Sequence, residues 1–274
     1  MITVAEALSR IPGWDGNDVA CTELKGGLTN RIFLVELEQH KSILRLDAQH
    51  TAAFDLDRPR ELVVLERAAG NGIAPEVIFS DVGAGILLSA FIVGRTWELS
   101  DLDDHENIEA LSALLHQVHA LPICGSAFDA SRIARRYLEN LASHDELHSF
   151  GARCLEIIDG IEGSGVTRLC HNDLVAENVI SASHLMLLDW EYACDNDPLF
   201  DLASLIAYHD LSDKMAQDLL SAYAGGESRE LAEQLQEQVR LYDAMQWLWL
   251  AIRHMITGTA DQAARLDELQ QRMR

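Results

Sequence analysis

The period of the hydrophobic pattern changes once along the 274-residue chain, near residue 93. Before that point the apolar residues form short runs rich in branched and aromatic side chains, which is typical of β-strands. Runs at 31–37 and 42–46 predict a β-hairpin, and runs at 77–79 and 86–92 predict two further strands. Between these pairs, apolar residues spaced by three and four indicate one helix over 60–69.

After residue 95 the apolar residues recur at steps of three and four, which indicates α-helices. The spacing is clearest in Ile108, Leu111, Leu114, Leu115 and Val118, and it returns over 131–142, 211–222 and 229–256. Two short apolar runs, at 179–180 and 185–188, interrupt the helical pattern and predict a small β-hairpin.

This change of pattern predicts an α+β fold of two lobes. A β-rich N-terminal lobe with one helix would cover residues 1–93, and a mostly helical C-terminal lobe would cover residues 94–274. A cleft between two such lobes is the natural place for a ligand.

Charge and composition exclude several classes of protein. The chain has 44 acidic and 21 basic residues, a formal net charge of −23, so it would repel a nucleic acid. Such a field concentrates cations, including magnesium or a cationic substrate, and it equally serves solubility. The chain shows neither a secretion signal nor a run approaching the ~20 apolar residues of a membrane span. Five scattered cysteines indicate neither disulfides nor a zinc site, so we expect a cytoplasmic enzyme without a membrane partner.

Three polar residues around the small predicted hairpin carry the chemistry. Phosphoryl transfer needs a carboxylate near the attacking hydroxyl and oxygen ligands for magnesium. Asp173 and Asn178 lie five residues apart on one loop, and Asp189 follows the second apolar run. A hairpin in the gap would return Asp189 to the same cleft. Each residue alone is better explained by a turn or a helix cap, but their combined spacing is that of a kinase catalytic loop.

These residues resemble the aminoglycoside phosphotransferase and choline kinase superfamily, whose members share the protein-kinase fold, and within it the choline/ethanolamine kinases. The resemblance runs from about Leu24 to Trp249. Four sequence motifs carry it, namely Gly26-Gly27-Leu28-Thr29-Asn30, Cys170-His171-Asn172-Asp173, Asp189-Trp190-Glu191-Tyr192-Ala193 and Asn196-Asp197-Pro198-Leu199-Phe200-Asp201-Leu202-Ala203.

The resemblance implies ATP and magnesium as cofactors and assigns roles to the catalytic loop. Asp173 would be the catalytic base, within a loop that includes His171, while Asn178 and Asp189 would hold magnesium. Asp201 would brace the loop from behind as structural support.

On the nucleotide side the resemblance implies a phosphate-covering loop, a cation on the second hairpin strand and a backbone site for adenine. The residues concerned are Gly26, Gly27, Thr29 and Asn30 in the loop, Arg45 with its partner Glu61, and Ser89, Ala90 and Phe91 at the lobe junction. The loop is not Gly-x-Gly-x-x-Gly, and the chain has no P-loop motif. Arg45 stands where protein kinases have lysine, and arginine is a sound bidentate phosphate ligand.

The acceptor is expected to be a small cationic alcohol, choline or ethanolamine, because aromatic faces beside carboxylates attract such cations. The residues predicted to meet it are Glu191, Tyr192, Asp243, Trp247 and Trp249. The helix that carries the tryptophans is apolar on nearly every side, so core packing explains them equally well. Thiamine kinase, aminoglycoside phosphotransferase and a non-catalytic nucleotide-binding scaffold stay open as alternatives.

Overall fold

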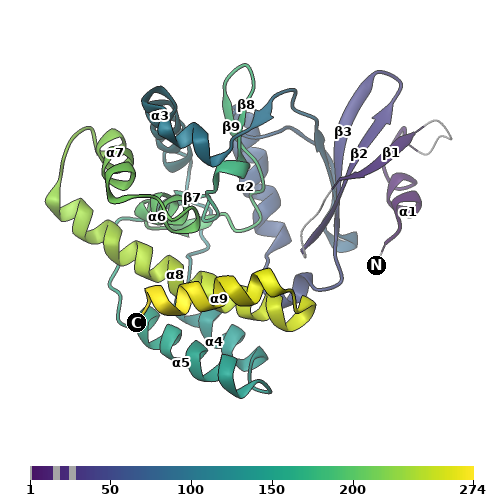
Figure 1. Ribbon diagram of the computed structural model, residues 1–274. Coiled ribbons are helices and arrows are strands. Elements are labelled where there is room, and N and C mark those ends of the chain that lie inside the picture. Colours follow the sequence, from purple (N-terminus) through teal and green to yellow (C-terminus); the bar gives the residue numbers. More distant parts are fainter. Residues whose placement is uncertain (1, 15–18, 25–28) are drawn as a thin grey trace.

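The computed structural model describes residues 2–14, 19–24 and 29–274. In these residues an antiparallel sheet is followed by a largely helical body, and Figure 1 shows the sheet beside the helices. The sheet has the strand order β1-β2-β3-β5-β4 and comprises β1 (Ala20–Leu24), β2 (Asn30–Leu37), β3 (His40–Asp47), β4 (Val77–Asp81) and β5 (Ile86–Ala90). The predicted α+β, kinase-like fold class is confirmed.

The predicted hairpin is β2 and β3, whose register pairs Leu37 with His40. The strands are longer than their apolar runs because a tight turn with Glu38 at φ 56° closes the hairpin. The short helix α1 (Val4–Leu8) packs against the sheet, where Ala7 joins a small core with Phe33, Val35 and Leu44. Neither α1 nor the edge strand β1 was predicted, because each is only five residues long and too short to show a clear period.

Helix α2 (Arg58–Gly70) connects the sheet to the helical body, as Figure 1 shows. It begins two residues before the predicted start because the Asp57 side chain accepts a hydrogen bond from the backbone of Arg60 and Pro59 favours the first turn. Its buried residues Val64 and Leu65 belong to the main core of the helical body. The polar first turn of α2 thereby lies at the junction of the two parts.

A close approach of two backbones follows β5. A Cβ on Gly94 would meet the carbonyl oxygen of Ser181 at 2.4 Å, so only glycine fits there. The next residues form β6 (Arg95–Thr96), which pairs with β8 (Val179–Ser181), and β8 pairs with β9 (Leu185–Leu187). The chain is thus fastened to the small predicted hairpin, which is confirmed, immediately after it leaves the sheet. The division into lobes at residues 93 and 94 stays a prediction.

The helical body is built on long amphipathic helices, with short 3-10 turns η1 (Thr51–Phe54), η3 (Leu99–Asp103) and η4 (Ala176–Asn178) at the connections. A further 3-10 turn, η2 (Val82–Ala84), joins β4 to β5 in the sheet. Its helices are α3 (His105–His119), α4 (Ala130–Asn140), α5 (Asp145–Asp159), α6 (Leu199–Tyr208), α7 (Asp213–Ala224), α8 (Arg229–Thr257) and α9 (Ala260–Arg272). Two further strands, β7 (Arg168–Cys170) and β10 (Cys194–Asn196), pair with each other. Searching the described residues finds no helix long and apolar enough to cross a membrane.

Two cores fill this body, and α6 and α8 pack together between them. Nine of the ten residues of α6 are buried, so this helix is surrounded by protein on all sides. α8 packs against α4, α5, α6 and α9, and it contributes residues to the second core. The catalytic segment predicted from the sequence lies between β7 and α6 and is therefore supported from below by the most buried helix.

Candidate active site

The predicted catalytic loop is held by a buried carboxylate on α6. Asp201 accepts hydrogen bonds from the backbone N–H groups of His171 (3.0 Å) and Asn172 (2.7 Å). Nε2 of His119 lies 3.0 Å from the same carboxylate. Burial by itself would raise the pKa of Asp201, but these hydrogen bonds and the neighbouring histidines keep it below its ordinary value. An ionised Asp201 therefore fixes the loop from behind.

Asn172 turns the chain sharply in this loop. Its φ of 62° is left-handed, a conformation that asparagine tolerates better than most residues. Its side-chain amide donates to the carbonyl of Tyr192 at 3.1 Å and accepts a hydrogen bond from Asn196 at 2.7 Å. The strained turn is thus held by partners on the two following segments, and it presents Asp173 to the cavity.

His171 lies beneath the loop and not in the cavity. Its Nε2 donates to the carbonyl of Leu188 at 2.8 Å, and its ring meets the edge of Trp190 at a centroid distance of 4.9 Å. The side chain is fully buried, and burial lowers its pKa, so the ring is neutral. This placement makes His171 a support for the segment that leads into Asp189, not a group that meets a substrate.

The structure brings Asp173, Asn178 and Asp189 together on the wall of one cavity. Asn178 donates its amide N–H to the carbonyl of Asp173 at 2.9 Å, which leaves its amide oxygen as an acceptor. Asp189 follows β9 in a left-handed conformation, with φ at 59°. The hairpin of β8 and β9 returns the chain as predicted, since Leu188 N–H bonds the carbonyl of Asn178 at 2.8 Å.

Burial opposes the ionisation of the two carboxyl groups on this wall, Asp173 and Asp189. Burial, and next the charge of Glu191, raise the pKa of Asp173 to about 7. The pKa of Asp189 is raised well above its ordinary value by burial and by Glu191, with Arg45 acting in the opposite direction. A hard divalent cation would offset that cost, and the carboxylate and amide oxygens of Asp189 and Asn178 are the donors that magnesium takes. The residues present therefore fit a magnesium ion.

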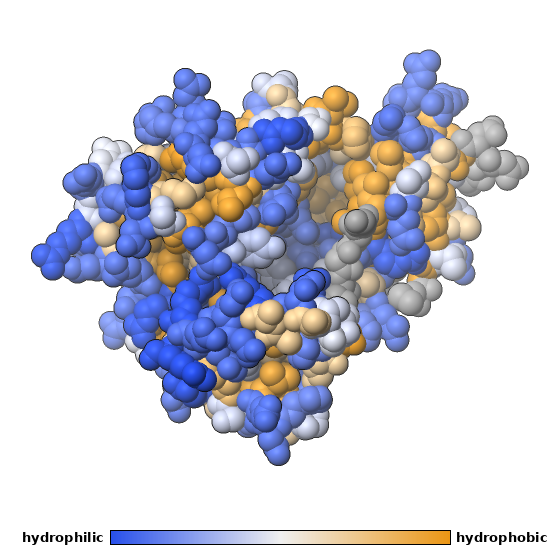
Figure 2. All heavy atoms as spheres, in the orientation of Figure 1, coloured by the Kyte–Doolittle hydropathy of each residue, from blue (hydrophilic) through white to orange (hydrophobic). Residues whose placement is uncertain are grey.

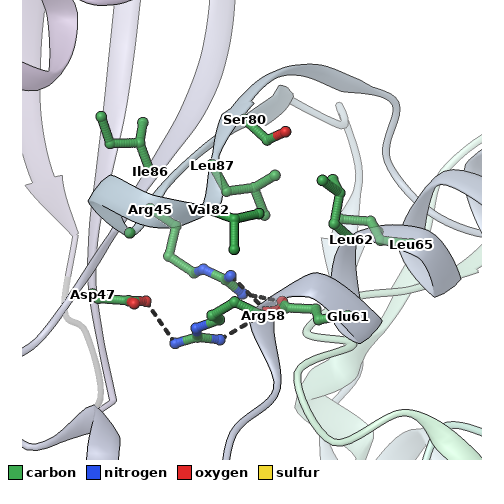
Figure 3. Close-up of a pocket in the computed structure, with 11 residues that line it drawn as sticks. Arg45, Asp47, Arg58, Glu61, Leu62, Leu65, Ser80, Val82, Ile86 and Leu87 are labelled. Atoms are coloured by element: carbon green, nitrogen blue, oxygen red, sulfur yellow. Dashed lines mark hydrogen bonds and ion pairs between the residues drawn. The ribbon is translucent and has the colours of Figure 1, made fainter. Parts of the chain in front are cut away.

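Arg45 and Arg58 converge on one buried carboxylate, as Figure 3 shows. Arg45, on β3, forms a bidentate ion pair with Glu61 of α2, with Nη2 2.8 Å from Oε2. Arg58, one turn before Glu61, contacts the same Oε2 at 2.8 Å and also reaches Asp47 at 2.8 Å. The pairing of Arg45 with Glu61 is the arrangement that the resemblance implied.

Glu191 has a different environment from the one expected of a substrate residue. It accepts hydrogen bonds from Thr29 (3.1 Å) and Asn30 (2.7 Å), and Arg58 lies 3.0 Å from its Oε2. It is 4% exposed. Glu191 thus connects the segment after Asp189 to the end of the expected phosphate loop and to α2. Gly26 and Gly27 of that loop lie outside the described residues.

The expected adenine site at the end of β5 has little hydrogen-bonding capacity left. Ala90 N–H donates to the carbonyl of Glu76 at 2.9 Å, and Phe91 N–H lies 3.4 Å from the carbonyl of Lys41. Ser89 pairs with Ile43 within the sheet. A base bound here would therefore have to use backbone groups other than these N–H donors.

The cavity has a volume of about 720 Å³ and opens between the sheet and the helices, where Figure 2 shows the surface hollowed. Tyr192 and Trp249 line it, and Nε1 of Trp249 donates to the Tyr192 hydroxyl at 2.8 Å. Six further aromatic side chains line it with them, namely Phe54, Phe128, Tyr137, Phe200, Tyr208 and Tyr242.

Two of the five residues predicted to meet the acceptor do not line this cavity. Trp247 is fully buried in the second core and packs on Phe150 at a centroid distance of 4.8 Å. Asp243 lies 2.5 Å from Arg272 of α9. The predicted shared face of Asp243 and Trp247 exists, but it is turned toward α5 and α9 and away from the cavity.

Sequence reasoning missed Arg58 and the arginine Arg253, which also lines the cavity. The only sequence signal for Arg58 was its position three residues before Glu61, which places both on one helix face. Nothing in the spacing singled out Arg253, and the tyrosines of α4, α6 and α8 looked like ordinary core residues.

The braced loop, the oxygen donors and the paired Arg45 together define a phosphotransferase with a kinase-like fold. The chain belongs to the phosphotransferase enzyme family, whose model matches residues 20–248.

Individual proteins extend the comparison. Protein LicA of Haemophilus influenzae is 28% identical over 207 residues, 72% of this chain, and the match spans 61% of that protein. The structure of choline kinase LicA from Streptococcus pneumoniae is similar with a TM-score of 0.75 at 23% identity, over 98% of this chain and 96% of that one. A choline/ethanolamine kinase family protein from Mesorhizobium loti gives a TM-score of 0.74 at 23% identity, over 97% and 91%.

Proposed function

We propose that this protein transfers the γ-phosphoryl group of ATP to the hydroxyl of a small cationic alcohol, choline or ethanolamine, in a magnesium-dependent reaction. The observation that carries the proposal is the convergence of Asp173, Asn178 and Asp189 on one cavity, above a loop fixed by Asp201. A protein that only bound a nucleotide would have no need of a buried carboxylate aimed at an acceptor.

Asp173 is the group that meets the acceptor. Its pKa of about 7 suits a general base at neutral pH, since it is both ionised in a good fraction of molecules and basic enough to take a proton. Asp173 accepts the hydroxyl proton while the acceptor oxygen bonds to the γ-phosphorus and the bond from that phosphorus to the ADP oxygen breaks. The loop contacts to Asp201 keep the carboxylate in place.

Asn178 and Asp189 would hold magnesium, which supplies charge stabilisation on the phosphate oxygens when bound. Arg45 would add a second cation on the phosphate side, and Glu61 fixes its orientation through the bidentate pair. The cavity aromatics and the acidic wall provide the environment that attracts a cationic acceptor.

The test is an ADP-release assay combined with ³¹P NMR of the product, run with choline, ethanolamine, thiamine and an aminoglycoside. We expect a phosphorylated choline or ethanolamine, with turnover abolished by EDTA and by Asp173→Asn. Asp145→Asn, at an exposed helix start, is the matched control and should keep full turnover. Phosphorylation of thiamine or the aminoglycoside alone would overturn the choice of acceptor, and ATP binding without any transfer would overturn the activity.

A further inference from the structure

Arg253 of α8 lines the acceptor cavity without a polar partner of its own. Its guanidinium lies over the ring of Trp249, 5.4 Å from the centroid. Its Nε is completely buried and makes no hydrogen bond. A buried N–H without a partner is costly, about 1–3 kcal/mol, so native proteins rarely leave one unless a ligand or water completes it.

The other arginines of this cavity are already engaged. Arg132 and Arg265 are paired with Asp55 and Asp210. Arg60 donates from Nη1 to the hydroxyl of Ser126 at 3.4 Å, although its Nε is also buried without a hydrogen bond. In the part of the chain that the structure describes, Arg253 is therefore the cavity cation whose side chain has neither an ion pair nor a hydrogen bond.

Gln246 offers a second unmatched group beside it. Its Oε1 is buried and has no hydrogen-bond partner among the described residues, and the side chain lines the same cavity. Positions 246, 249 and 253 are spaced by three and four residues, so all three lie along one face of α8. An unsatisfied donor and an unsatisfied amide thus flank the ring of Trp249 on one wall.

This wall belongs to the same cavity as the predicted catalytic residues. Gln246, Trp249 and Arg253 line it together with Asp173, Asn178 and Asp189. A molecule whose hydroxyl meets Asp173 therefore occupies the same space of about 720 Å³ that this wall borders.

We propose that Arg253 and Gln246 form a second subsite, which binds a hydrogen-bond-accepting group carried by the acceptor alcohol. The guanidinium would donate to that group, and Gln246 Oε1 would accept from an N–H beside it, as in a ring nitrogen next to an amine, whereas a carboxylate would be a partner for Arg253 alone. Choline and ethanolamine have no acceptor beyond their hydroxyl. The guanidinium already covers the Trp249 face, so it repels a bare ammonium there and attracts a group with lone pairs. The inference rests on the proposed transfer to an alcohol and, within that activity, favours an acceptor that carries such a group over choline and ethanolamine.

The experiment compares pairs of acceptors that differ only in the second group. Serine is set against ethanolamine for a carboxylate, and thiamine against N-methyl hydroxyethylthiazolium for a heterocycle. In the unmodified protein we expect that, for at least one of the two pairs, the larger acceptor has a kcat/KM at least tenfold higher than the smaller one. In Arg253→Met that preference should fall at least tenfold, through the KM of the acceptor. Arg240→Met, an exposed arginine of the same helix paired with Glu237, is the control and should preserve the preference.

Three results would overturn the subsite. The larger member could be no better in either pair, the preference could survive Arg253→Met, or the substitution could raise only the KM of ATP. Phosphorylation of ethanolamine or choline alongside any of these would leave the proposed activity standing. Failure of every alcohol to accept phosphate would remove the activity and the subsite together. Calorimetric titration of the preferred acceptor into the magnesium-loaded protein and into Arg253→Met checks that binding itself is lost.

Discussion

Arg58 and Glu191 form an ion pair of 3.0 Å that joins the first turn of α2 to the segment immediately after Asp189. Both side chains are largely buried, and Arg58 also contacts Asn30, Asp47 and Glu61. One guanidinium therefore connects Asn30, at the end of the expected phosphate loop, with β3, which carries Arg45, and with the segment after Asp189. Burial by itself would lower the pKa of Arg58, but the charges of Glu61, Glu191 and Asp47 raise it by more, so the guanidinium stays charged.

Replacing Arg58 should damage stability and catalysis together. In Arg58→Met the carboxylates of Glu61 and Glu191 stay buried without their shared cation, and breaking such a pair costs about 3–5 kcal/mol. We expect a lower free energy of unfolding in urea and a fall in kcat of more than tenfold, because Glu191 no longer fixes the Asp189 segment. Glu66→Gln, exposed on the same helix, should cost under about 1 kcal/mol and leave kcat unchanged.

A double-mutant cycle with Glu191→Gln separates the ion pair from its surroundings. If the two residues act through each other, the double variant should lose clearly less than the sum of the single losses. Strictly additive losses in both unfolding free energy and kcat would contradict a link between α2 and the segment after Asp189 through Arg58 and Glu191.

Asp173→Asn should abolish turnover and yet stabilise the metal-free protein. The pKa of Asp173 is raised to about 7 in the fold, so between about pH 4 and 7 the folded state binds a proton that the unfolded chain has lost. Stability from this group is present at low pH and falls as the pH rises through that window. Asparagine cannot titrate and avoids the loss. Thermal unfolding in EDTA should show a larger gain in Tm for the variant at pH 8 than at pH 5, and an equal gain at both would contradict the raised pKa.

Asp201→Asn should lower kcat more than its effect on stability explains. An amide can accept with one oxygen only, so one of the backbone N–H groups of His171 and Asn172 loses its charged partner. Asp195 is a matched control, since it is buried and accepts hydrogen bonds of 2.7 Å from Cys124 and Gly125. We expect similar losses of unfolding free energy in both variants and a much larger fall in kcat for Asp201→Asn. Equal falls in kcat would assign Asp201 to stability alone.

The two tryptophans of α8 should separate into a packing role and an acceptor role. Trp247→Phe leaves a cavity in the second core and should lose part of the about 3–5 kcal/mol that complete removal of a buried tryptophan costs. Trp249→Phe removes the hydrogen bond to Tyr192 and the face under Arg253, so it should raise the KM of the acceptor with a smaller effect on stability. Urea unfolding and steady-state kinetics on both variants test this, and a raised acceptor KM for Trp247→Phe alone would reverse the assignment.

The sequence by itself determined the elements whose signals are local. The change of hydrophobic period near residue 93 follows from backbone geometry, so it indicated the sheet, the helical body and the small hairpin correctly. A two-stranded hairpin returns the chain to its starting edge, so the sequence also predicted that Asp189 lies on the same cavity wall as Asp173 and Asn178. The same pattern did not indicate α1, β1, α5, α6 or α9.

Only the tertiary structure decided which way the remaining polar and aromatic residues face. Trp247 and Trp249 are two positions apart on one helix, about 200° around its axis, and packing on α5 decides which of them reaches the cavity. Glu191 and Arg58 are 133 residues apart in sequence, so no local spacing could pair them. Long-range contacts of this kind depend on how the helices and the sheet dock, and the free energy of docking is summed over the whole core.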